Sequence, residues 1–100
     1  MSDDNEFGFT LPAFDAGNAL QQIRRALRDL KLTERGGAFE LGGRQVVRLS
    51  QEEGAVMARI VRRPTTGSPE WDAQAVRSGA DQRKLLDELR RRLERWQRED

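Results

Sequence analysis

Arginine is the most informative residue type in this chain for predicting what the chain can bind. The 100 residues contain 18 Lys and Arg against 17 Asp and Glu, and the only lysines are Lys31 and Lys84. A guanidinium group stays protonated and binds carboxylates or phosphates, whereas it does not serve as a general base near neutral pH. The composition therefore favours binding over catalysis.

Most side chains that build catalytic and metal sites are absent. The chain has no cysteine, histidine or tyrosine. This excludes a Ser-His-Asp triad, a Cys-His pair and an imidazole zinc site, and it leaves only carboxylate pairs or lysine chemistry. The acids Asp3, Asp4 and Glu6 lack the ligand spacing and central glycine of a calcium loop. We predict a protein that is not an enzyme and has no cofactor or metal.

The overall composition fits one small globular domain. Hydrophobic residues make up 36% and charged residues 35% of the chain, which suits a single core at this length. The apolar runs are too short to cross a bilayer, and the acidic start lacks the basic region of a secretion signal. We expect a cytoplasmic protein that does not bind a membrane.

The last twenty residues carry six arginines, interleaved with leucines at helical spacing. Six acids nearly cancel the charge of this segment, and several precede a basic residue by four positions, so pairing within one helix explains most of them. The more specific prediction is an apolar stripe for a protein partner or a second copy. Its residues are Leu86, Leu89, Leu93 and Trp96.

Residues 1–14 form an acidic, phenylalanine-rich N-terminal segment ahead of a domain at residues 15–100. Phe7 and Phe9 alternate with polar residues, a spacing typical of a strand. The segment either docks on its own domain, as a strand or a flap, or adds a strand to a partner. We therefore add Phe7 and Phe9 to the predicted protein interface.

A basic cluster provides an alternative function, nucleic-acid binding. Residues 17–64 hold ten basic and five acidic side chains, and such an excess suits phosphate contacts. An exposed charged sheet face that blocks edge-to-edge aggregation is the commoner explanation of such a cluster, and no aromatic residue lies between Phe39 and Trp71 to stack on bases. The alternative contacts are Arg44, Arg48, Arg59, Arg62 and Arg63.

Hydrophobic periodicity predicts an α-β-β-β-α order. Apolar residues at helical spacing indicate a helix over residues 16–32 with Asp15 as N-cap and Lys31 in its last turn. Three strands are expected at residues 38–41, 45–49 and 55–63, followed by a long helix from about residue 79 to 97. Residues 71–77 fit a short helix or an extended segment.

Strand register follows from the apolar pattern. A Gly42-Gly43 turn would place Leu41 opposite Arg44, whereas a three-residue loop places Phe39 opposite Val47 and keeps the apolar residues on one face. We expect the three-residue loop, and a four-residue loop at residues 51–54.

The predicted element order is similar to that of the double-stranded-RNA-binding domain. That family has a basic start to its final helix, and the corresponding residues 78–84 here include Asp81 before Arg83 and Lys84. The histidine-bearing loop of the family has no counterpart, so the resemblance implies a topology only.

Together these observations predict an α+β domain with a three-stranded antiparallel sheet, an N-terminal amphipathic helix and a long C-terminal helix. We expect a non-catalytic protein-interaction module that associates with itself through the C-terminal helix or the N-terminal segment. The alternative is a nucleic-acid-binding domain with a basic sheet face.

Overall fold

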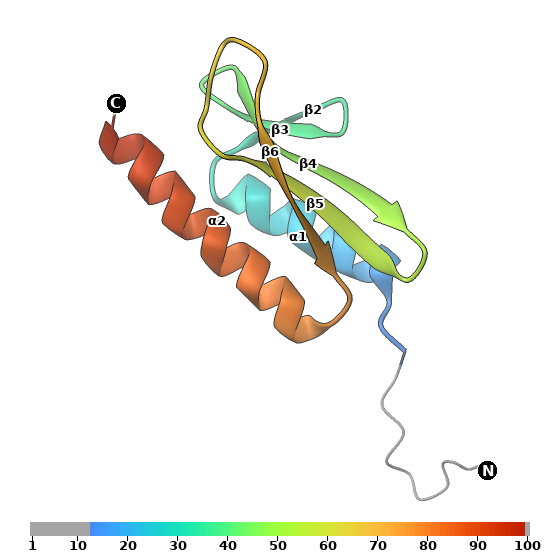
Figure 1. Ribbon diagram of the computed structural model, residues 1–100. Helices are drawn as coiled ribbons and strands as arrows, with labels where there is room; N and C mark the ends of the chain where they lie inside the picture. Colours follow the sequence, from blue (N-terminus) through green and yellow to red (C-terminus); the bar gives the residue numbers. More distant parts are fainter. Residues whose placement is uncertain (1–12, 100) are drawn as a thin grey trace, which may run out of the picture.

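The protein is an α+β domain in which two helices cover one face of a five-stranded antiparallel sheet (Figure 1). The computed structural model describes residues 13–99. The α+β class and the positions of the helices at either end confirm the prediction, but the sheet has five strands and not three. The elements are α1 (Ala16–Asp29), β2 (Thr33–Arg35), β3 (Ala38–Leu41), β4 (Arg44–Glu52), β5 (Ala55–Val61), β6 (Trp71–Val76) and α2 (Gly79–Glu99).

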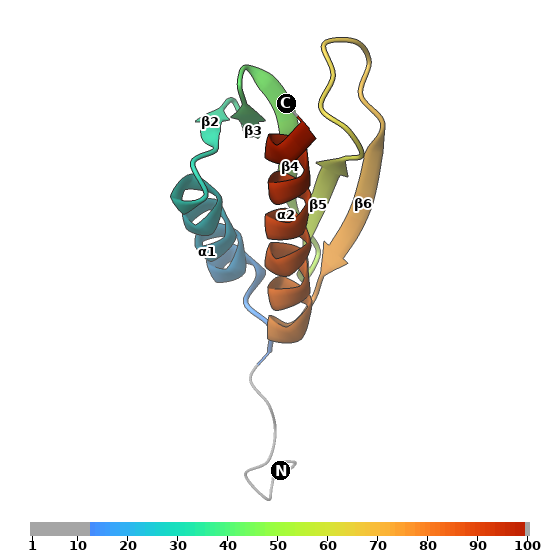
Figure 2. The same cartoon turned by 90° about the vertical axis from the view of Figure 1, so that its left-hand side faces the viewer.

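The strands follow one another in the sheet as they do in the sequence, in the order β2-β3-β4-β5-β6. Every neighbouring pair is antiparallel. Figure 2 shows α1 and α2 side by side on the same side of this sheet. The two additional strands also remove the resemblance in element order to the double-stranded-RNA-binding domain.

Helix α1 begins where the sequence predicted and ends earlier. The Asp15 carboxylate accepts a hydrogen bond from the Asn18 backbone N–H at 3.0 Å, which makes Asp15 the N-cap. The helix ends at Asp29, and Lys31 adopts a left-handed conformation with φ of 73°. The prediction that Lys31 lies in the last helical turn was wrong, because the chain reverses there to enter β2.

The β3–β4 hairpin combines features of both predicted loops. Gly42 and Gly43 form a two-residue turn with positive φ angles of 60° and 82°, and Leu41 pairs with Arg44. Phe39 nevertheless pairs with Val47, as the three-residue loop required. A shift of register between these pairs leaves one extra residue in β4. This bulge keeps the apolar residues on the core face despite the tight turn.

The β4–β5 hairpin is also tighter than expected, because Glu52 pairs with Ala55 across Glu53 and Gly54. Val47 lies opposite Ile60 and Leu49 opposite Ala58. These pairs confirm that the alternate apolar residues of both strands share one face.

Strand β2 was not predicted, and of the two conformations left open for residues 71–77 the structure has the extended one, as β6. β2 is only three residues long, and its sequence Thr-Glu-Arg has no apolar pattern. In β6, Trp71 pairs with Val61 and Val76 with Val56. Residues 72–75, between Trp71 and Val76, are alanines and polar residues that suit a helix equally well. Pairing with β5 therefore decides the conformation of this segment.

Helix α2 begins at Gly79, as predicted, behind a local network of caps. The Ser78 hydroxyl accepts a hydrogen bond from the Asp81 N–H at 3.1 Å, and the Asp81 carboxylate accepts one from the Arg77 N–H at 3.0 Å. These two contacts resemble a capping box and fix the turn from β6 into the helix.

The core lies between the helices and the covered sheet face. Phe39 is its largest fully buried side chain. The largest fully buried side chains of the core are Ile23, Leu27, Phe39, Val46, Val47, Val56, Ile60, Val61, Val76, Leu85 and Leu89, each at most 1% exposed. In the described part of the chain, neither helix is long and apolar enough to cross a membrane.

Candidate functional site

The face of the sheet opposite the two helices has no covering helix or strand in residues 13–99 (Figure 2). We call it the open face. Side chains alternate between the faces of a strand, so the residues next to the core positions point to it. Ala38, Ala55 and Met57 belong to this set, and none of them belongs to the core cluster.

A single row of residues crosses the open face from one edge of the sheet to the other. The strand register places Arg35 opposite Ala38, Ala38 opposite Arg48, Arg48 opposite Arg59, and Arg59 opposite Ala73. Three of the five side chains are arginines. Arg48 and Arg59 are direct neighbours in the middle of the sheet. The Cβ atoms of directly opposed residues lie about 5 Å apart.

The Arg48–Arg59 pair has no carboxylate partner among residues 13–99. Arg35 forms an ion pair with Glu40 at 3.7 Å, whereas no salt bridge in the described part of the chain involves Arg48 or Arg59. Like charges directly opposite each other destabilise a strand pair. A bound anion would remove this repulsion, so the pair is a candidate site for an anionic group.

Polar and apolar groups surround the arginine pair. A hollow of about 430 Å³ is lined by Arg48, Arg59, Ser50 and the Gly36-Gly37 turn, together with Leu49. The Ser50 hydroxyl is shielded from solvent and has no hydrogen-bond partner in the described residues. Because this hydroxyl is not exposed, the guanidinium groups of Arg48 and Arg59 are the accessible donors of the hollow, and they suit a phosphate or carboxylate ligand.

Trp71 brings an aromatic ring to the same face. It pairs with Val61, which lies two residues after Arg59, so Trp71 and Arg59 are diagonal neighbours. Trp71 is half-buried and packs against the core cluster, of which its partner Val61 is a member. Met57, opposite Ser50 and Ala75, extends the apolar part of the face.

The structure separates the five arginines of the predicted nucleic-acid contact into three groups. Only Arg48 and Arg59 meet on the open face. Arg62 is held by Asp72 at 2.8 Å and lies 3.7 Å from Glu70, so its charge is compensated.

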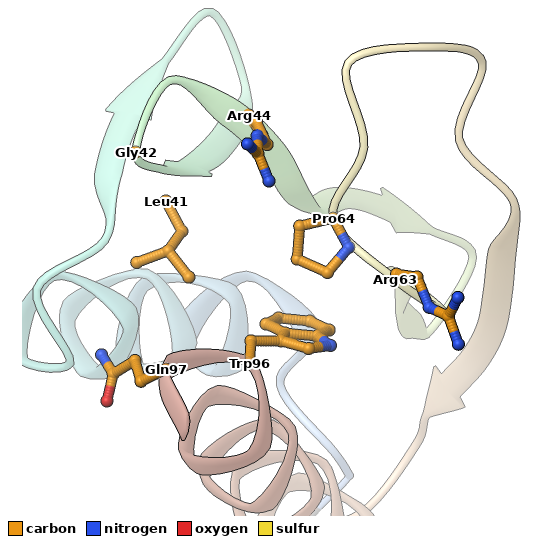
Figure 3. Close-up of a pocket in the computed structure, with 7 residues that line it drawn as sticks. All are labelled: Leu41, Gly42, Arg44, Arg63, Pro64, Trp96 and Gln97. Carbon is orange, nitrogen blue, oxygen red and sulfur yellow. The ribbon is translucent and has the colours of Figure 1, made fainter. Parts of the chain in front are cut away.

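Arg44 and Arg63 line a second hollow, of about 390 Å³, between the end of the sheet and α2 (Figure 3). Its other residues include Leu41, Pro64 and Trp96. The Arg63 guanidinium extends away from Leu41 in this view. This hollow opens beside the last turn of α2, so it does not continue the arginine row.

Four charged residues form a network that joins β6 to α2. Arg92 donates to Glu88 at 2.7 Å, to Asp72 at 3.0 Å and to the Val61 carbonyl at 3.0 Å. Its side chain is only 15% exposed. Hydrogen bonds from Arg62 and Arg92 lower the pKa of Asp72, and a hydrogen bond from Arg92 lowers the pKa of Glu88. Since every member already has a partner, we assign this network to stability.

The stripe predicted as a protein interface is mostly inside the protein. Leu89, Leu93 and Trp96 are 5% exposed or less, and Leu86 is half-buried against the same core. The regular apolar spacing of α2 thus serves packing on its own sheet. Contact with a partner through these three side chains would require α2 to leave the domain. Phe7 and Phe9, the other two predicted contacts, lie outside the described residues.

Several residues of the open face were missed in the sequence because their strands were not identified. Arg35 lies in β2 and Trp71 in β6. The two-residue alternation of Trp71, Ala73 and Ala75 was the available clue for a strand that exposes one face. Among residues 13–99, no group of three or more Asp or Glu side chains could hold a metal ion.

One charge reversal tests whether the arginine pair is a source of strain. Arg59→Glu would place a carboxylate directly opposite Arg48, and opposite charges at such positions stabilise a strand pair by about 0.2–1 kcal/mol. We expect the free energy of unfolding, measured by urea denaturation, to rise. A decrease would mean that Arg59 has a favourable partner in the free protein.

Comparison of the chain with family models, curated proteins and solved structures finds no significant match.

Proposed function

We propose that this domain is a non-catalytic binding module and that its open face binds single-stranded nucleic acid. The observation that carries the proposal is the directly opposed pair Arg48 and Arg59, which has no carboxylate partner in residues 13–99. Two guanidinium groups on directly opposed residues suit the phosphates of a nucleic-acid backbone.

The neighbouring side chains favour a single strand over a duplex. Proteins that bind single strands combine a positively charged surface with aromatic rings on which bases stack. Trp71 supplies such a ring next to Arg59, and Met57 supplies a further apolar contact. The major groove of a duplex commonly accepts a helix, whereas the basic pair lies on an open sheet.

The proposal changes the order of the two functions expected from the sequence. The stripe on α2 supported a protein partner, but three of its four residues are used by the core. The basic face was the alternative, and its weakness was the lack of an aromatic residue. Pairing of β6 with β5 puts Trp71 diagonally beside Arg59 on the open face, which supports the proposal.

A titration with a fluorescently labelled single-stranded oligonucleotide tests this function by anisotropy. The variant is Arg48→Glu/Arg59→Glu, which lowers the net charge by four. The matched control is Arg25→Glu/Arg83→Glu, which makes the same charge change at two exposed positions on the helices. We expect the open-face variant to bind about tenfold more weakly or worse, and the control to stay within a few-fold of the original protein.

The salt dependence gives an independent criterion. Two phosphate contacts to a single strand contribute a slope of about 1.4 to the fall of log K with log salt. The open-face variant should lose this contribution and the control should keep it. Equal loss of binding in both variants would mean that net charge alone is responsible, and an acidic peptide that competes as well as the oligonucleotide would identify a protein ligand instead.

A further inference from the structure

The two edges of the sheet differ in how well they are protected. The β2 edge has three residues, and Arg24 and Arg28 of α1 hold its Glu34 in ion pairs. A short charged strand is a common way to prevent pairing with another chain. The β6 edge has six residues with no lysine or proline among them.

The β6 edge is also regular. All six residues from Trp71 to Val76 pair with β5 in one continuous register without a bulge. In an antiparallel pair, the backbone groups of alternate residues point away from the neighbouring strand. No strand in residues 13–99 receives those of β6. The edge thus presents unpaired N–H and C=O groups along roughly 20 Å, which favours the addition of another strand.

We infer that β6 pairs with β6 of a second copy in antiparallel orientation, about a twofold axis through Ala73. This register sets Ala73 opposite its own copy and Trp71 opposite Ala75 of the second copy. Both pairs lie on the open face, and the small alanine leaves room for the indole ring.

On the covered face, the same register sets Asp72 opposite Gln74 of the second copy. The Gln74 amide can donate a hydrogen bond to that carboxylate. A register centred on Gln74 also keeps the faces aligned, and it puts Asp72 opposite Val76. That register would place a carboxylate beside an apolar side chain, so the one centred on Ala73 is favoured.

The surface beside this edge has the charge balance that a twofold contact needs. A hollow next to Gln74 is lined by α2 side chains of both signs, with Lys84, Arg91 and Arg92 against Asp87 and Glu88. Within one copy Glu88 already pairs with Arg91 and Arg92, and Asp87 pairs with Arg90. Because the contact is twofold, each copy offers the other the same set of charges. Of the three cations in this hollow, only Lys84 has no ion-pair partner in residues 13–99, so Lys84 of one copy is the group that can pair with an acid of the other.

Pairing through β6 would extend the arginine row. The row ends at Ala73 in one copy, and in the paired form it continues through Ala73 of the second copy to that copy's own Arg59 and Arg48. One dimer would then present two arginine pairs on a ten-stranded open face. The pairing itself does not depend on the proposed nucleic-acid binding, since its evidence lies in the edge strand.

Analytical ultracentrifugation of the full-length chain without nucleic acid, over a range of concentrations, tests the inference. Ala73→Lys should give a monomer, because it sets two lysines side by side at the twofold axis. Ala73 is exposed, so the fold should survive, which a thermal melt by circular dichroism verifies. The control Thr33→Lys also introduces a lysine, at an exposed position of the β2 edge, and should leave the dimer intact.

Mixing complementary variants gives a stringent second arm. Ala73→Lys and Ala73→Glu should each be monomeric alone and form a dimer when mixed, because opposite charges then meet at the axis. A monomeric original protein, or an Ala73→Lys variant that dimerises like it, would overturn the inference. Dimerisation that begins only after Phe7→Ser/Phe9→Ser would also overturn it, by assigning the β6 edge to the protein's own N-terminal segment.

Discussion

Replacing Leu89 with aspartate is expected to unfold the domain. The Leu89 side chain is fully buried in the middle of α2 and packs in the cluster between α2, α1 and the sheet. Removing a buried leucine costs about 2–5 kcal/mol, and burying a carboxylate without a partner adds to this cost. The total reaches the roughly 5 kcal/mol at the lower limit of stability for a small domain. Circular dichroism and urea denaturation at neutral pH would show the loss.

Gln97→Asp is the matched control, because it introduces the same group at an exposed position of the same helix. It should change the free energy of unfolding by less than about 0.5 kcal/mol. A Leu89→Asp variant that stays folded and loses only self-association would contradict the structure. It would return the α2 stripe to the role of an interface.

Arg92→Ala should also lower the free energy of unfolding, although by less than Leu89→Asp. Its guanidinium binds Glu88, Asp72 and the Val61 carbonyl, and it joins α2 to β5 and β6. A hydrogen bond to a charged group contributes about 1.5–3 kcal/mol, and these contacts share one side chain, so we expect a loss of roughly 2–3 kcal/mol. Arg91→Ala removes a neighbouring side chain that is 67% exposed, and it should cost less than about 1 kcal/mol.

The same network sets the direction of an acid dependence. The pKa values of Asp72 and Glu88 are lowered in the folded state by their arginine partners. Their contribution to stability is therefore complete above the ordinary carboxyl pKa of about 4 and is lost as the pH falls through the lower folded-state values. In urea titrations from about pH 6 to about pH 3, Arg92→Ala should lose less stability than the original protein. An equal loss would show that the network does not hold these two carboxylates.

The elements that sequence periodicity predicted well are those with a one-sided apolar pattern. Helix α1 and the covered faces of β4 and β5 have such patterns, and the pairing of Phe39 with Val47 followed from them. The bulge could not be predicted in the same way. The Gly42-Gly43 turn and the apolar pattern each required a different loop length, and only an extra residue in β4 reconciles them.

The candidate site was harder to predict because it depends on strand pairing. Arg48 and Arg59 were identified as basic residues of a sheet face, but their direct opposition follows from the register of β4 and β5. Trp71 lies in a segment whose alanines suit a helix or a strand. The apolar stripe of α2 could not be assigned from the sequence for a related reason. Its spacing is the same whether the helix packs on its own sheet or on a partner.

The most direct test of the open face is nuclear magnetic resonance of the two tryptophan indole N–H groups during titration with a single-stranded oligonucleotide. Trp71 lies on the proposed binding face, whereas Trp96 is 3% exposed and packs in the core beneath the covered face. If the open face binds the oligonucleotide, we expect the Trp71 signal to shift or broaden as oligonucleotide is added, while the Trp96 signal stays in place. A shift of Trp96 with Trp71 unchanged, or no change in either signal at low salt, would contradict it.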